Sequence, residues 1–282
     1  MNAMIGKLIK SAAMMALAIC IPAVTVVHAA DANPAFKRLA AGSTTTVDHA
    51  AWDRLLKAYV VSGADGLNRV AYARFKAEGH AALKAYVAAL QKVDPATLDR
   101  SEQFAFWVNL YNAKTIDVVL DKYPVKSIKD ISLGGGLKTL ISGGPWQAKI
   151  MKVSGVDLTL DDVENTILRP IYRDPRVHYS VNCASVGCPN LAVEAYTGGK
   201  LEAMLEAGAK AFVNSPRGAL VEGGTIKASS IYEWFQADFG GSEATVLDHL
   251  RKYASPALTE QLNKIGRIAR YDYDWQLADA KQ

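Results

Sequence analysis

Cysteine is scarce in this chain, which has three cysteines among 282 residues, Cys20, Cys183 and Cys188. So few cysteines exclude a small disulfide-rich scaffold, in which disulfides replace a hydrophobic core. The C-x4-C spacing of Cys183 and Cys188 differs from the C-x-x-C of thioredoxin-like motifs. The spacing of these two cysteines with His178 and Glu164 also matches no established zinc pattern, so we predict no metal site.

The sequence also lacks the motifs of nucleic-acid and nucleotide binding. Its net charge is only +4, and it has no polybasic tract and no RNA-reading signature, so we expect no nucleic-acid partner. The Gly-rich stretch from Ile131 to Gly144 lacks the Gly-Lys-Ser/Thr ending of a P-loop and the GxGxxG order of a dinucleotide site. We therefore predict no cofactor, and this stretch is typical of a mobile surface loop over a cleft.

The longest apolar run lies at the N-terminus. Lys7 and Lys10 precede an apolar stretch from Ala12 to Val27, and Val27-His28-Ala29 resembles an A-x-A cleavage site. The run is short and no stop-transfer segment follows, which predicts a secretory signal peptide over residues 1–29 and not a membrane span. We expect a periplasmic or secreted protein without a stable membrane span after signal cleavage, in a compartment where disulfides persist.

The remaining residues, roughly 250, suffice for one large domain with a hydrophobic core. Helical patterns are interrupted by short strands in irregular order, which favours α+β over α/β. We predict a helix-rich single domain with a small, mostly antiparallel sheet packed on a long buried helix. We assign residues 31–98 to an N-terminal helical lead-in, 99–250 to a core domain, and 251–282 to a C-terminal helix and strand that complete the same domain.

The long helix is predicted from Ser101 to about Lys122, and Asp99 with Glu102 forms a capping box at its start. Apolar residues lie on both of its faces, so the helix is expected to be buried nearly all round. Asn109 and Asn112 then project together into an apolar environment. Because a buried amide without partners costs about 1–3 kcal/mol, both must be hydrogen-bonded. They either tie down neighbouring backbone or position a catalytic side chain or a substrate carbonyl.

A second capped helix is predicted from Thr159, with Asp162 in its capping box, and Pro170 is expected to close it. This helix carries Glu164. The simplest interpretation of Glu164 is an ion pair with a base such as Arg169 or a place on the solvated flank of the helix. A role in a functional site is the alternative.

The stretch from Val177 to Pro189 holds His178 and both downstream cysteines. Its first residues, Val177 to Val181, alternate between apolar and polar, which predicts a half-buried strand, and its glycine and proline predict a turn. On a strand Cys183 lies on the face opposite His178, roughly 16 Å away if the chain stays extended. A direct pair between them requires the chain to turn near Asn182.

Three motifs occur in order: FWVNLYNA at 106–113, DVENTILR at 162–169, and VHY followed by Cys and Pro within 177–189. Together they resemble the domain-of-unknown-function 547 family over roughly residues 99–250. The family also resembles, distantly, papain-like and transglutaminase-like cysteine enzymes, and it brings no established reaction. A His commonly follows the helix Glu in this family, and here that position is Asn165. The resemblance implies five site residues: Asn109, Asn112, Glu164, His178 and Cys183.

The leading hypothesis is a hydrolase or acyl transferase that acts on an amide or ester of a small molecule or peptide. Such an enzyme needs a cysteine thiolate, a His that generates it and a polar side chain that orients the His. Cys183, His178, Glu164 and either Asn109 or Asn112 supply these residue types.

The alternative is a Cys183–Cys188 disulfide in a non-catalytic binding or structural module of the cell envelope. Export favours this disulfide, and the intervening turn residues allow two cysteines five apart to meet. The two hypotheses differ in one observation. Cys183 Sγ is either within hydrogen-bond reach of an imidazole or bonded to Cys188.

Overall fold

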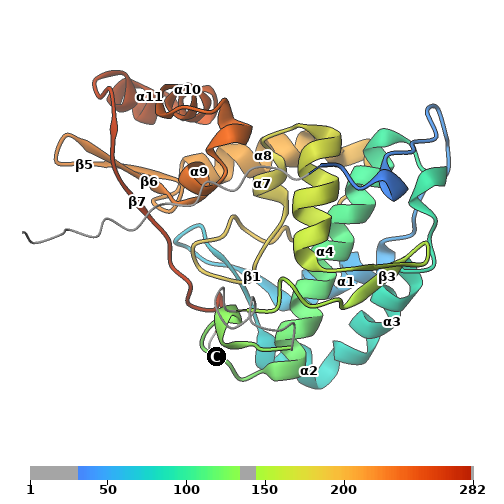
Figure 1. Cartoon of the computed structure of the whole chain (residues 1–282). Coiled ribbons are helices and arrows are strands. Elements are labelled where there is room, and N and C mark those ends of the chain that lie inside the picture. The colour runs from blue at the N-terminus through green and yellow to red at the C-terminus, as the bar shows by residue number, and fades with distance from the viewer. Residues whose placement is uncertain (1–30, 134–143, 281–282) are drawn as a thin grey trace, which may run out of the picture.

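A computed structural model of the chain describes residues 31–133 and 144–280 (Figure 1). The predicted signal peptide and positions 134–143 of the predicted Gly-rich loop lie outside the described residues. Within the described ranges, no helix is both long enough and apolar enough to cross a membrane.

The fold is built around one helix, α4 (Arg100–Lys122), which runs through the middle of the molecule (Figure 1). Every residue from Glu102 to Leu120 except Lys114 is buried, as the apolar residues on both faces predicted. Asp99 caps the helix, because its side chain accepts a hydrogen bond of 2.8 Å from the Glu102 N–H.

The capping box at α4 is only half formed, because the Glu102 side chain does not return to Asp99. Its Oε1 accepts a hydrogen bond of 2.8 Å from the Val47 N–H, and its Oε2 accepts one of 2.7 Å from the Gly198 N–H. Glu102 therefore ties two distant loops to the start of the central helix.

Helices from the N-terminal third pack around α4 and form the larger of two hydrophobic clusters with it. Residues 67–75 contain both a strand and the start of a helix. The elements are α1 (Ala50–Tyr59), β1 (Val60–Ser62), β2 (Asn68–Val70), α2 (Tyr72–Glu78) and α3 (His80–Leu90), with short 3-10 helices at Pro34–Phe36, Pro95–Thr97 and Ile128–Asp130.

The second hydrophobic cluster lies at the upper left in Figure 1 and contains a three-stranded sheet. In this sheet β5 pairs antiparallel with β6, and β6 pairs parallel with β7. The elements are α8 (Leu201–Val213), β5 (Ala219–Glu222), β6 (Thr225–Ser229), α9 (Ile231–Trp234), the 3-10 helix η6 (Gln236–Phe239), α10 (Glu243–Tyr253), α11 (Pro256–Asn263) and β7 (Ile268–Asp272).

The α+β class is confirmed, but the strands of the described chain form three small sheets and not one sheet on the buried helix. Two of them are isolated antiparallel hairpins, β1–β2 and β3–β4, where β3 is Met151–Val153 and β4 is Val156–Leu158. The three-stranded sheet belongs to the second cluster, away from the core of α4. Short hairpins make their own hydrogen bonds locally, so nothing in their alternation shows whether they join a larger sheet.

The second capped helix begins as predicted, with both hydrogen bonds of the capping box between Thr159 and Asp162. It starts as α6 (Leu160–Asp162) and continues as a π-helix, η4 (Val163–Tyr172). The prediction that Pro170 closes it is wrong, because Pro170 lies inside η4. An α-helix would place the carbonyl of residue i−4 against the proline ring, and the wider π turn relieves that clash.

The predicted strand at 177–181 is wrong. Residues Val177–Ser180 form a short helix, α7. Its start is set by Asp174, whose side chain accepts a hydrogen bond of 2.9 Å from the Arg176 N–H and whose carbonyl accepts one of 3.1 Å from the Val177 N–H. Four alternating residues fit one helical turn as well as a strand, and the local capping by Asp174 decides between them.

The C-terminal segment, residues 273–280, runs from β7 back to the opposite part of the molecule (Figure 1, red). It is held by backbone hydrogen bonds to three segments that are far apart in the sequence. These bonds are Gly187 N–H to Asp274 O (2.8 Å), Val186 N–H to Gln276 O (2.8 Å), Leu277 N–H to Lys126 O (2.8 Å), Ala278 N–H to Ala184 O (2.9 Å) and Val70 N–H to Ala278 O (2.9 Å).

Candidate functional site

A cavity of about 200 Å³ lies where the two clusters meet, beside α4, α6, η4 and the loop after α7. Glu164, His178 and Cys183 all line it, so the fold brings three of the five predicted residues together. A larger and more open groove of about 960 Å³ runs past Arg100 and Arg173 and contains none of the five. The smaller cavity is therefore the candidate site.

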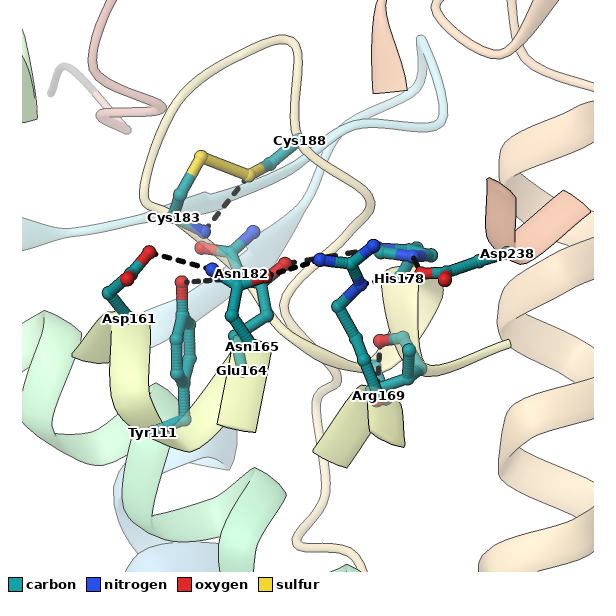
Figure 2. Close-up of polar contacts among 12 residues, drawn as sticks. Tyr111, Asp161, Glu164, Asn165, Arg169, His178, Asn182, Cys183, Cys188 and Asp238 are labelled. Atoms are coloured by element: carbon teal, nitrogen blue, oxygen red, sulfur yellow. Dashed lines mark hydrogen bonds and ion pairs between the residues drawn. A yellow bond between two sulfur atoms is a disulfide. The ribbon is translucent and has the colours of Figure 1, made fainter. Parts of the chain in front are cut away.

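Cys183 and Cys188 form a disulfide on one wall of this cavity, with their Cα atoms 6.2 Å apart (Figure 2). The Tyr273 hydroxyl lies 3.1 Å from Cys183 Sγ and 3.2 Å from Cys188 Sγ, and the Ser185 hydroxyl lies 3.2 Å from Cys183 Sγ. Of the two states that the sequence left open for Cys183, the structure has the disulfide.

His178 points its Nε2 at the Asp238 carboxylate, 2.7 Å from Oδ2 (Figure 2). A carboxylate only accepts hydrogen bonds, so Nε2 carries the hydrogen. The other ring nitrogen, Nδ1, lies 3.8 Å from Glu164 Oε1, which is too long for a hydrogen bond. The imidazole is almost fully buried and stacks on Phe235 with 4.3 Å between ring centroids. His178 is thus held between two acidic side chains from different elements.

Asp238, on η6, is a site residue that the sequence did not reveal. Burial acts to raise the pKa of this carboxyl, but hydrogen bonds from His178 and Arg169 outweigh burial and hold the pKa below its ordinary value. Arg169 donates from Nε to Asp238 Oδ2 at 2.5 Å. No local motif marks Asp238, because its partners lie about 60 and 70 positions earlier in the chain.

Glu164 lies at the start of η4, and its side chain is 14% exposed toward the cavity. Its Oε2 accepts a hydrogen bond of 3.2 Å from the Tyr111 hydroxyl. Burial raises the pKa of Glu164 above its ordinary value of 4.5, against the opposing charges of His178 and Arg169. A carboxyl with a raised pKa at a cavity wall is suited to exchange a proton.

Asn165, which follows Glu164 in the sequence, bridges two charged side chains (Figure 2). Its Nδ2 donates to Asp161 Oδ1 at 2.6 Å, and its Oδ1 accepts from Arg169 Nη1 at 2.5 Å. A chain of polar contacts therefore runs from Asp161 through Asn165 and Arg169 to Asp238. This chain supports the wall that carries Glu164.

The side-chain amides of the two asparagines of α4 hydrogen-bond to backbone groups, and neither asparagine lines the cavity. Asn112 donates to the Ser180 carbonyl and accepts from the Asn182 N–H, both at 2.8 Å. Asn109 makes the same pair of bonds with Tyr196, at 2.8 and 3.1 Å. Of the two roles that the sequence left open, the structure shows that they tie down neighbouring backbone.

Half-buried aromatic side chains form much of the remaining wall, and no role was predicted for them from the sequence. They come from the turn before β3, from α9 and from the C-terminal segment. They are Trp146, Trp234, Phe235, Tyr273 and Trp275. The dense aromatic composition of residues 231–235 and 271–275 was visible, but only the return of the C-terminal segment brings the two stretches together.

The candidate site contains no cluster of metal ligands among the described residues. One group elsewhere, His80 with Asp117 and Asp121 on α3 and α4, has donor atoms close enough to hold an ion. Lys84 already pairs with both of these carboxylates, at 2.9 and 3.0 Å. This group is therefore an ion-pair network between two helices.

Comparison with known protein families matches residues 95–213 to the family described as "Protein of unknown function, DUF547". The resemblance found in the sequence is confirmed, and the matched segment of this chain belongs to that family. It contains α4, Glu164, His178 and the disulfide, whereas Asp238 and most of the aromatic wall lie beyond it. No curated protein and no solved structure matches the chain.

Proposed function

We propose that this DUF547 domain binds a small organic ligand in its aromatic cavity, as a disulfide-stabilised binding module of the cell envelope. The observation that carries this proposal is the pairing of Cys183. Its sulfur is bonded to Cys188, and the nearby imidazole of His178 faces Asp238. A cysteine hydrolase needs a free thiolate beside a base, and here each of the two groups has another partner.

The composition of the wall also favours binding. Small-molecule sites are concave and mostly apolar, with a few polar groups that orient the ligand. Here the aromatic rings and the disulfide form the apolar part, and Glu164, Asp161 and Asn165 are the polar groups. A cavity of about 200 Å³ accepts a compact group and not a folded partner.

Binding is tested with three compounds of nearly equal shape: choline, the neutral 3,3-dimethylbutan-1-ol and the anionic 3,3-dimethylbutanoate. Saturation-transfer NMR on the full mature protein detects which of them contact it. We expect at least one to bind and Tyr273→Leu to weaken that binding. Tyr271→Leu is the matched control, because Tyr271 lies in the same part of the chain but does not line the cavity. If none of the three binds, the proposal is wrong.

We further propose that the protein is exported to the periplasm or secreted. The apolar pattern of residues 1–29 and the disulfide support this location, since disulfides persist in oxidising compartments. Mass spectrometry of the protein recovered from a periplasmic extract or culture medium tests it. An N-terminus at Ala30 or Asp31 is expected, and a protein that stays in the cytoplasm with residues 1–29 attached contradicts the proposal.

A cysteine-dependent hydrolase or acyl transferase is the second candidate, favoured by one observation. Cys183, His178 and Glu164 line the same cavity, so reduction of the disulfide by an external thiol releases a Cys183 thiol into it. Iodoacetamide labelling before and after mild reduction tests this function. It predicts a reactive thiol that Cys183→Ser abolishes and Cys188→Ser retains, together with hydrolysis of an activated ester. A reduced protein without a reactive thiol rules it out.

A further inference from the structure

We infer that the ligand of this cavity carries a quaternary ammonium group, which the aromatic rings enclose above the Glu164 carboxyl. The inference rests on the proposed ligand-binding function and names the class of ligand. It follows from the arrangement of the rings, from the sign of the charges around them and from the shortage of free hydrogen-bond acceptors.

The rings form a continuous cluster of partly exposed side chains. Trp275 is its centre, with ring centroids 4.6 Å from Tyr273, 5.8 Å from Trp234 and 5.8 Å from Trp146. Trp234 and Tyr273 also contact each other, at 4.9 Å. All four side chains are only half-buried although they line a cavity. A cation within about 6 Å of such a ring face is attracted by the ring quadrupole, and tryptophan attracts it most strongly.

The charges at the cavity favour a cation over an anion. Two acidic side chains, Asp161 and Glu164, line it, and within the described parts of the chain no lysine or arginine does. The remaining titratable lining groups are two tyrosine hydroxyls and His178, and the latter is paired with Asp238. An anionic ligand would meet two carboxyls, whereas a cation would meet a favourable partner at each.

Two aromatic rings of the cavity wall already contact cations of the protein. The Lys129 ammonium lies 5.0 Å from the Trp275 centroid, and the Arg169 guanidinium lies 4.5 Å from the Phe235 centroid. Neither Lys129 nor Arg169 lines the cavity, so they do not fill the space that a ligand would take. These two contacts show that rings of this wall attract positive charge in this fold.

A quaternary group fits better than a primary ammonium because the carboxyl acceptors at the cavity are few and one oxygen of each is already engaged. Glu164 Oε2 accepts from Tyr111, and Asp161 Oδ1 accepts from Asn165. A primary ammonium carries three N–H donors, each of which loses water on entry and needs an acceptor. A quaternary ammonium has no N–H donor, and aromatic faces with one nearby carboxylate satisfy it.

The test compares choline with 3,3-dimethylbutan-1-ol by isothermal titration of the full mature protein, because the two differ only in the charged nitrogen. We expect choline to bind roughly tenfold more tightly, or better. Glu164→Gln should reduce that ratio, and Glu233→Gln, next to Trp234 but not at the cavity, should leave the ratio unchanged.

The cation assignment would be overturned if choline and the alcohol bound with equal affinity, or if the alcohol bound more tightly and Tyr273→Leu weakened that binding. The proposed binding function would stand in both cases. Tighter binding of methylammonium than of tetramethylammonium would overturn the quaternary assignment. If neither choline nor its neutral and anionic isosteres bind, the proposed function itself fails. The comparison between ligands uses the unsubstituted protein, so it remains decisive even if Glu164→Gln does not fold.

Discussion

The polar side chains of α4 and those of the cavity wall are both largely buried, yet they are used differently. Asn109 and Asn112 direct both their donors and their acceptors to backbone of the segment 180–196. Glu164 has one hydrogen bond, from Tyr111, and a raised pKa that reflects incomplete solvation. Amides hydrogen-bonded to backbone rigidify a core, whereas a carboxyl left short of partners retains the capacity to bind.

The two regions differ in the same way in their aromatic residues. Trp107 of α4 is completely buried and contacts Phe36 and Phe106 edge to face, at 4.9 Å each. Trp234 and Trp275 at the cavity are only half-buried. Changes in α4 should therefore cost stability, and changes at the cavity should cost binding.

Asn112→Ala should produce the largest loss of stability. It leaves the Ser180 carbonyl and the Asn182 N–H without their partner inside the core, which costs roughly 2–5 kcal/mol of unfolding free energy. Urea denaturation followed by circular dichroism measures it. Asn263→Ala on the exposed side of α11 is the control and should stay within about 0.5 kcal/mol of the parent. A loss at position 112 no larger than that of the control would erase the distinction between the regions.

Removal of the disulfide should have the next largest effect. The double variant Cys183→Ser, Cys188→Ser opens a short loop and should lose about 2 kcal/mol of unfolding free energy. Urea midpoints are compared with and without a phosphine reductant. The reductant should lower the urea midpoint of the parent to that of the variant, and it should leave the midpoint of the variant unchanged. A parent that is insensitive to the reductant would show that the bond contributes nothing to stability.

Trp234→Leu should cost less stability than the same substitution at a buried tryptophan. We expect a loss below about 1.5 kcal/mol, against at least about 2 kcal/mol for Trp107→Leu, because only the second leaves a cavity in a closed core. Thermal unfolding ranks the two variants. Equal losses would mean that the ring at 234 is part of the core and not of a binding wall.

The smallest expected change concerns the dependence of stability on pH. Burial raises the pKa of Glu164 and the Asp161 charge adds to this, while His178, Arg169 and the Tyr111 hydroxyl act in the opposite direction. The folded protein therefore holds a proton that the unfolded chain releases near pH 4.5, so the contribution of Glu164 to stability falls as pH rises through the raised pKa.

Glu164→Gln should remove this contribution. The unfolding free energy of the variant minus that of the parent should increase between pH 4.5 and 7. Urea denaturation at a series of pH values measures both. Glu233→Gln is not a matched control here, since burial also raises the pKa of Glu233. Glu260→Gln, on the exposed side of α11, serves instead. If the unfolding free energy of the parent instead increases relative to that of the Glu164 variant as pH rises, the predicted pH dependence of the Glu164 contribution has the wrong sign.

Periodicity and capping residues predicted the helical part of the fold well. The burial of α4 on both faces, the capping box of Thr159 and the hairpin between β5 and β6 follow from residues that are neighbours in sequence. The errors occur where a pattern is too short to choose between periods. Residues 177–180 satisfy both a strand and a single helical turn, and Pro170 is tolerated because the helix widens.

The candidate site was predictable only in part, for a related reason. Glu164, His178 and Cys183 lie within motifs, and the disulfide between Cys183 and Cys188 was one of two open alternatives. Asp238 and Trp275 come from segments whose approach depends on long-range pairing, which local pattern does not encode. The family match stops at residue 213, before much of the wall begins.

The return of residues 273–280 across the molecule determines when the cavity wall can form during synthesis of the chain. A ribosome makes these residues after all the others that line the cavity, so the wall formed by Tyr273 and Trp275 is assembled last. A nascent chain already containing α4 and its surrounding helices would have a core but no closed site. Ligand capture would then require that synthesis had passed residue 275.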